Sequence, residues 1–242
     1  MNTGLLIIAA ALWGAAAGSF LPRAAYRFSA PAGEPWRDSC PGEHPLKGWL
    51  GRASCPRCEA GGYGPRTAPL MIATALVCAA LAAATGTRPE LGVWLLLAPV
   101  GVLLTAVDFR VRRLPDPLTL PFAGAALALL GLTALVPEHA GEWTTALLGS
   151  LALGGGYFVL FLINPAGMGF GDVKLALGAG AVLGWYGWPT VMLGTFAGFL
   201  LGALYGGALV VARRASRKTA IAFGPFLVTG ALLGLLVGAY TA

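Results

Sequence analysis

The stretch Gly167-Met168-Gly169-Phe170-Gly171-Asp172-Val173-Lys174 is the best starting point for predicting the fold. Long apolar runs flank it on both sides, so its carboxylate and its amine are expected at or near the edge of a lipid bilayer. An ionisable group is expensive there and is a functional candidate by default. The alternating glycines remove side chains and allow another segment to approach closely. Asp172 is therefore the first candidate site residue.

The composition predicts an all-α polytopic membrane protein. Hydrophobic residues make up 57% of the 242 residues and charged residues 11%, and the mean hydropathy is +0.76. Such a chain has too few polar groups to cover a soluble globule. Its 36 glycines suit helices that pack by close backbone approach within lipid. The net charge of +6 does not indicate nucleic-acid binding, because the basic residues form no separate domain or arm.

The apolar runs predict a bundle of about eight transmembrane helices. The first covers residues 4–21, and basic residues follow it rather than precede it, which favours a retained helix over a cleaved signal peptide. Pro22 is expected to end or kink this helix. We expect three parts: a first helix in 1–21, a cysteine-containing loop in 22–67 and a seven-helix core in 68–242. The further helices are expected at about 68–86, 91–107, 117–137, 143–164, 173–187, 189–212 and 223–241.

The basic residues predict the orientation of these helices. With eight spans, fifteen of the sixteen basic residues fall on one side, and Arg88 alone falls on the other. Loops rich in lysine and arginine face the cytoplasm. Both termini are then outside, and the connections on the outer side are expected to be plain turns. Trp185, Tyr186 and Trp188 in the last of these turns suit an interfacial belt.

A second acid, Asp108, follows an uninterrupted apolar run at the cytoplasmic end of the third expected span. Asp116 has a simpler explanation, as a helix N-cap with Pro117 at the first helical position. The predicted topology brings Asp108 and Asp172 to the same membrane edge. Two neighbouring acids cannot both ionise easily, so they could share a proton and activate water between them, which is the requirement for aspartyl peptide hydrolysis.

Four blocks of the sequence resemble a known family, the type IV prepilin peptidases, whose GxGD signature of intramembrane aspartyl proteases matches Gly169-Phe170-Gly171-Asp172. The resemblance places the two catalytic aspartates at Asp108 and Asp172. The blocks stand in the family's order and span nearly the whole chain. They are Gly18-Ser19-Phe20-Leu21 with Arg23 and Tyr26-Arg27, then Val107-Asp108 through Pro121, then Gly167 to Leu175, then Lys218 through Phe226.

The resemblance implies a membrane peptidase that cleaves the basic leader of prepilins or pseudopilins at the cytoplasmic face of the bacterial inner membrane. In such substrates the cut precedes the hydrophobic stem. Lys174 could contact a lipid phosphate, a substrate acid or a helix end, or simply extend to the interface. The alternative from another class is a small transporter that uses Asp108 and Asp172 as an ion or proton site. Transporter sites tend to lie near the midplane, whereas both acids are expected at one edge.

The polar loop carries a candidate metal site. Cys55-Pro56-Arg57-Cys58 presents two thiols on a tight turn, and Cys40 and His44 could complete a Cys3His zinc set. Family members often have two CxxC pairs here, whereas Glu43 leaves the first pair of this chain incomplete. A redox pair or unligated cysteines are the alternatives. Cys78 lies in an apolar run and is expected to serve packing.

A second activity is also implied by the resemblance. Many prepilin peptidases methylate the new amino terminus from S-adenosylmethionine, and the cysteine-rich loop has been linked to that role. The sequence contains no Rossmann glycine pattern that would support this cofactor independently. Because the cysteine pattern of this chain differs from that of the family, methylation and its absence are both compatible with the sequence. The sequence also does not select one pilus or secretion system, or one oligomeric state.

Overall fold

The structure is a computed structural model that describes residues 2–58, 62–165, 167–213 and 221–242. Within these residues the regular structure is helical, with two isolated antiparallel bridges in the loop after the second helix. The prediction of an all-α fold is therefore confirmed. The helices are α1 (Thr3–Ser19), α2 (Leu21–Phe28), α3 (Thr67–Thr85), α4 (Glu90–Val111), α5 (Asp116–Thr133), α6 (Trp143–Ile163), α7 (Phe170–Gly184), α8 (Trp188–Val211) and α9 (Gly224–Thr241).

The helices are those of a multi-pass membrane protein. Six of those described are long and apolar enough to cross a bilayer, and a seventh span results if α1 and α2, which are bent by 45°, count as one. The expected count of eight holds approximately, because α1 and α3 to α9 match the eight predicted segments. The short α2 is additional, and Pro22 in its first turn accounts for the bend. α7 has only 15 residues and is almost wholly buried.

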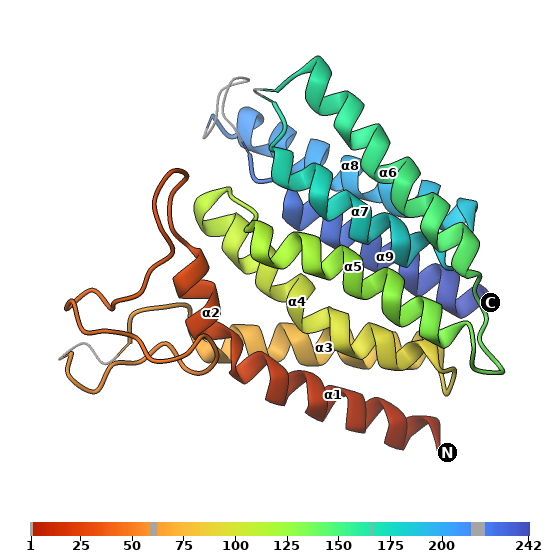
Figure 1. The fold of residues 1–242 in the computed structure, drawn as a ribbon, viewed down its shortest axis with the longest axis horizontal. Coiled ribbons are helices and arrows are strands. Elements are labelled where there is room, and N and C mark those ends of the chain that lie inside the picture. The colour runs from red at the N-terminus through yellow and green to blue at the C-terminus, as the bar shows by residue number, and fades with distance from the viewer. Residues whose placement is uncertain (1, 59–61, 166, 214–220) are drawn as a thin grey trace.

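The bundle has two distinct ends (Figure 1). The loop after α2, the end of α4 and the beginnings of α7 and α9 lie at one end, which we call the loop end. The two chain termini lie at the opposite end, which we call the terminal end. The loop end therefore collects the segments that the sequence placed at a common membrane edge.

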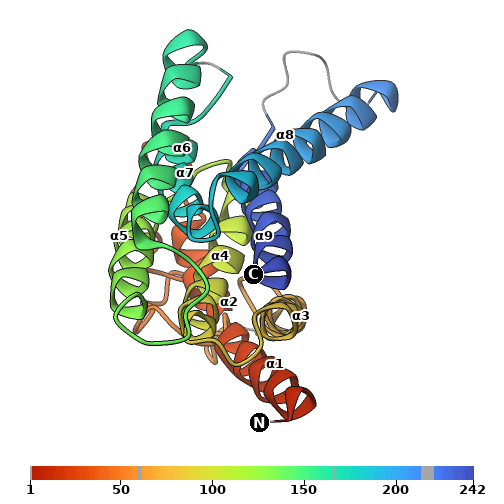
Figure 2. The same ribbon diagram turned by 90° about the vertical axis from the view of Figure 1, so that its right-hand side faces the viewer.

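Close backbone approach shapes the packing. Gly14 and Gly18 bring α1 against α3, where a Cβ on Gly18 would lie 2.8 Å from the carbonyl oxygen of Leu70. This small-residue spacing is typical of helix contacts in lipid. The buried α7 lies between α5, α6 and α9, whereas α8 packs mainly on α9 and diverges from α6 (Figure 2). α7 is thus held from several sides in the position that Asp172 requires.

The terminal end corrects one expectation. Its connections are not plain turns, because Glu90 is fully buried and Trp185 is only 1% exposed. The Glu90 carboxylate accepts a hydrogen bond from the Tyr186 hydroxyl (3.2 Å) and lies 3.8 Å from Nε of Arg88. Trp188, at 45% exposure, does suit an interfacial belt. The packing of α4, α7 and α9 turns Glu90 and Trp185 inward. Hydropathy does not indicate how each helix is rotated about its axis.

Candidate functional site

Asp108 lies in the last turn of α4, at the loop end of the bundle. Its side chain is 4% exposed, and its carboxylate accepts a hydrogen bond from the backbone N–H of Gly224 (3.0 Å). α4 ends three residues later at Val111, and the next residue, Arg112, adopts a left-handed conformation (φ 51°). The apolar run before Asp108 makes α4 a membrane helix, and the chain turns away immediately after this acid.

Asp172 is the third residue of α7, a helix that begins directly after Gly169. Its side chain is 7% exposed, and its carboxylate accepts a hydrogen bond from the N–H of Gly169 (3.2 Å). This contact is one half of a capping box, in which the third helical residue reaches back to the N-cap backbone. The glycine-rich sequence thus ends in a helix start that fixes the orientation of the acid.

The structure brings the two acids together, close enough to interact electrostatically. Leu114, in the connection after α4, packs between their supporting helices. A Cβ on Gly171 would lie 2.8 Å from Cβ of Leu114, and one on Gly224 would lie 2.7 Å from Oδ2 of Asp108. Neither glycine therefore tolerates a side chain without a shift of its neighbours. Close approach is the reason for these two glycines.

Among the described residues, the polar contacts recorded for the two carboxylates are with helix ends and not with cations. Each carboxylate bonds an N–H at a helix amino terminus, that of α9 for Asp108 and that of α7 for Asp172. Such termini carry a partial positive charge that stabilises anions. The two ion pairs recorded within the described ranges involve other acids. Two buried, mutually repelling carboxylates at a membrane edge can share a proton and activate a water molecule.

Lys174 and Asp116 form one of those ion pairs, with 2.7 Å between Nζ and Oδ2. The expectation of Asp116 as an N-cap is wrong, since α5 begins at Asp116 itself and the N-cap position is that of Pro115. Lys174 lies at the beginning of α7 and reaches the beginning of α5 instead of extending alone to the interface. The pair ties the two helix starts together beside the candidate site.

Tyr157 on α6 is a residue of this region that the sequence did not reveal. It is 1% exposed, it interacts electrostatically with Asp172, and its hydroxyl has no hydrogen-bond partner among the residues described. Its ring stacks on Phe199 of α8 and contacts Phe223. A single tyrosine in an apolar run resembles an ordinary packing residue, so only the tertiary structure identifies it.

The four residues predicted as zinc ligands converge in the loop after α2. Sγ of Cys40, Cys55 and Cys58 and a ring nitrogen of His44 lie within 4.8 Å of one another. Each half of the cluster sits on a turn closed by a bridge, Ser39 to Pro45 in one and Ser54 to Gly62 in the other. His44 thus lies where the second cysteine of a complete first CxxC pair would be expected to contribute its sulfur.

The donor set and its spacing fit a zinc ion. Nδ1 of His44 is 3.5 Å from Sγ of Cys40, 3.7 Å from that of Cys55 and 3.6 Å from that of Cys58. Tetrahedral ligands at the Zn–S distance of about 2.3 Å stand roughly 3.8 Å apart. Burial raises the pKa of Cys40, but hydrogen bonds with Cys58 and His44 outweigh it and lower that pKa to about 6. The hydrogen bond with Cys40 raises the pKa of Cys58 to about 11.

Two further predictions concern residues away from the sites. Cys78 is fully buried in α3 and serves packing, as expected. Arg214, Arg217 and Lys218 of the expected basic loop before α9 lie outside the described residues.

Comparison with known proteins identifies the family. Residues 95–207, which include both acids, match the type IV leader peptidase family. A prepilin leader peptidase/N-methyltransferase of Aeromonas salmonicida is 34% identical over 205 residues, 80% of this chain and 66% of the relative. The enzyme of the same name from Escherichia coli is 32% identical over 181 residues, 70% of this chain and 73% of the relative. A third, from Klebsiella pneumoniae, is 35% identical over 161 residues.

The chain thus spans about two thirds of the length of the curated relatives that it matches. No solved structure matches it. The family match over the core and the similarity over most of the chain agree with the resemblance that the four sequence blocks carry. This chain belongs to the type IV leader peptidase family.

Proposed function

We propose that this protein is a prepilin leader peptidase in which Asp108 and Asp172 form an aspartyl catalytic pair. One observation carries the proposal. Two buried acids, 64 residues apart in the sequence, meet at one end of a membrane bundle, each oriented by the amino terminus of a helix. An acid buried in such a bundle is a functional candidate by default, and these two, unlike Glu90, take part in no ion pair recorded among the described residues.

In the proposed reaction one carboxylate accepts a proton from water while the other, protonated, donates a hydrogen bond to the scissile carbonyl. The water oxygen bonds to the carbonyl carbon, the C–N bond breaks, and a proton goes to the leaving amine. Mutual repulsion favours a pair that holds one proton, which is the state this mechanism needs. Each carboxylate keeps acceptor positions for this task, because the structure records one hydrogen bond to each within the described ranges.

The proposed substrates are prepilins or pseudopilins, by analogy with the relatives, which carry the name prepilin leader peptidase. The proposal places the loop end on the cytoplasmic side of the bacterial inner membrane and both termini outside. The basic residues described at 22–67, 110–113 and Lys174 support it, since all lie at or beside the loop end. Lipid then surrounds the exposed apolar residues of α8.

The cysteine cluster is proposed as a structural zinc site. It would close the loop after α2 through Cys40, His44, Cys55 and Cys58, and the peptidase step does not need the ion. Methylation from S-adenosylmethionine is the second activity in the relatives' names. The peptidase proposal stands without it, and the experiment below measures it separately.

The test is co-expression of the protein with candidate prepilins, followed by mass analysis of the pilin amino terminus. We expect removal of the leader, with the new terminus directly before the hydrophobic stem. An added methyl mass would establish the second activity, and an unmodified terminus would exclude it for that substrate. Intact leaders with every prepilin, together with ion-dependent solute uptake, would favour the transporter alternative.

A further inference from the structure

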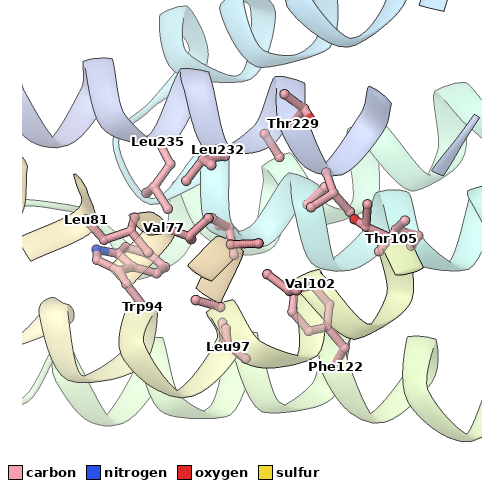
Figure 3. A pocket seen from close by; sticks show the side chains of 18 residues that line it. Val77, Leu81, Trp94, Leu97, Val102, Thr105, Phe122, Thr229, Leu232 and Leu235 are labelled. Atoms are coloured by element: carbon pink, nitrogen blue, oxygen red, sulfur yellow. The ribbon is translucent and has the colours of Figure 1, made fainter. Parts of the chain in front are cut away.

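An apolar cavity of about 250 Å³ lies within the bundle, between α3, α4, α7 and α9 (Figure 3). Its side-chain lining is apolar except for the hydroxyls of Thr105 and Thr229 and the indole nitrogen of Trp94. The Thr229 hydroxyl already donates to the carbonyl oxygen of Pro225 (2.7 Å). An apolar cavity of roughly 150 Å³ can hold benzene and stays free of water. This one has room for one or two large apolar side chains.

The cavity begins one helical turn from the candidate catalytic pair, on the side of the membrane interior. Thr105 precedes Asp108 by one turn on α4, and Leu175 follows Asp172 by one turn on α7. Val228 lies one turn into α9 from the N–H that Asp108 accepts. A helical turn rises about 5.4 Å. α4, α7 and α9 therefore place the wall of the cavity that faces the loop end one helical turn from the two carboxylates.

The cavity also opens sideways. Ala73 on α3 and Thr229 on α9 line it, and both residues are exposed. An apolar segment in the bilayer could thus reach the cavity from the lipid between these two helices, without crossing the polar loop end. Trp94 and Leu235, which are buried, close the end of the cavity that faces the terminal end of the bundle.

We propose that this cavity binds the first apolar side chains of the substrate stem, directly after the cleaved bond. This inference rests on the proposed peptidase function. A scissile peptide held at the two carboxylates leaves its apolar stem pointing into the membrane, and the cavity is the space that lies there. Lipid is as apolar as the stem, so selectivity comes from shape and close packing rather than from transfer out of water.

A cavity-filling variant tests the proposal. Ala98 lines the cavity, and Ala98→Phe would occupy part of it. In lipid nanodiscs we expect the KM for prepilin to rise about tenfold with kcat little changed, within the range for a misfit apolar group. Leu96→Phe is the matched control, since Leu96 lies on the same helix but is 52% exposed outside the cavity. Its kinetics should equal those of the unaltered protein.

The substrate provides the second half of the test. When the first large stem residues of the prepilin are changed to alanine, Ala98→Phe should lose its effect, because changes to two groups that share one contact or cavity are not additive. Equal kinetics for Ala98→Phe and the unaltered protein would overturn the cavity assignment while leaving the peptidase function intact. An unaltered protein that cleaves no prepilin would instead overturn the proposed function.

Photocrosslinking keeps the proposal testable if Ala98→Phe does not fold. Benzoylphenylalanine in place of the exposed Ala73 makes little demand on packing. Combined with Asp172→Asn to slow turnover, it should crosslink to stem residues just after the cleavage site. Crosslinks to phospholipid alone would show that a lipid acyl chain occupies the cavity, and would contradict the proposal.

Discussion

The two ends of the bundle both bury acids, but they treat them differently. At the terminal end, the carboxylate of Glu90 lies near Arg88 and accepts hydrogen bonds from the Tyr186 hydroxyl and the Ala140 N–H. At the loop end, Asp108 and Asp172 each accept one recorded hydrogen bond, from a helix amino terminus. A carboxylate offers about four acceptor positions. The difference lies in the cation. Glu90 faces Arg88 and is part of the structure, although its Oε2 has no hydrogen-bond partner among the described residues. The ion pairs recorded there do not include the two aspartates, whose free acceptor positions can take a water or a substrate.

The largest expected effect is at the loop end. Asp108→Asn or Asp172→Asn should reduce prepilin cleavage at least about 10²-fold, because an amide cannot exchange the proton that general acid–base catalysis moves. Both variants should still yield folded membrane protein, since asparagine can accept the same backbone hydrogen bond. The measurement is leader removal followed by mass analysis, with thermal unfolding as the control for folding. Undiminished cleavage by either variant would sink the catalytic assignment.

The opposite result is expected at the terminal end. Glu90→Gln should lower the free energy of unfolding by about 1–3 kcal/mol, because it removes the charge that faces Arg88 and weakens the acceptor of the Tyr186 hydroxyl. Cleavage per folded molecule should stay near that of the unaltered protein. Unfolding in detergent measures the first quantity and leader cleavage the second. Glu138→Gln, at an exposed position of the same end, is the matched control. A stable Glu90→Gln variant with lost activity would break the contrast between the two ends.

The cysteine cluster extends the comparison outside the membrane. Cys55→Ser should remove a zinc content of about one ion per chain, because a tetrahedral site with three ligands binds zinc far more weakly. Cleavage should fall less than for the aspartate variants, since the cluster is held by the loop and not by α4 or α7. Metal analysis of purified protein decides the first point. Cys78→Ser, in the buried part of α3, should keep its zinc.

The smallest effect is expected at Asp116, an acid beside the candidate site that forms an ion pair with a lysine. Asp116→Asn breaks the pair with Lys174, but the Asp116 side chain is 60% exposed, and exposed ion pairs contribute about 0–1 kcal/mol. Cleavage should stay within about threefold of the unaltered protein. A loss as large as that of Asp172→Asn would show that Asp116 belongs to the catalytic machinery rather than to the support of α5 and α7.

Local patterns in the sequence were sufficient for much of the fold and of the candidate site. Apolar runs of span length predicted the helices, and Pro22 predicted the bend between α1 and α2. An acid next to an apolar run is visible without coordinates, so Asp108 and Asp172 could be selected. The sulfur and imidazole groups of the candidate metal cluster were likewise recognisable from residue type and spacing, including His44.

The sequence by itself determined which segments enter the membrane and which residues carry chemistry, because hydropathy and residue type are properties of the chain. Only the tertiary structure decided that Glu90 is buried and paired, that Lys174 meets Asp116, that Tyr157 approaches Asp172 and that a cavity lies beneath the carboxylates. Each of these depends on the rotation and close packing of helices distant in sequence. In an apolar helix almost every face is apolar, so the pattern does not reveal which one turns inward.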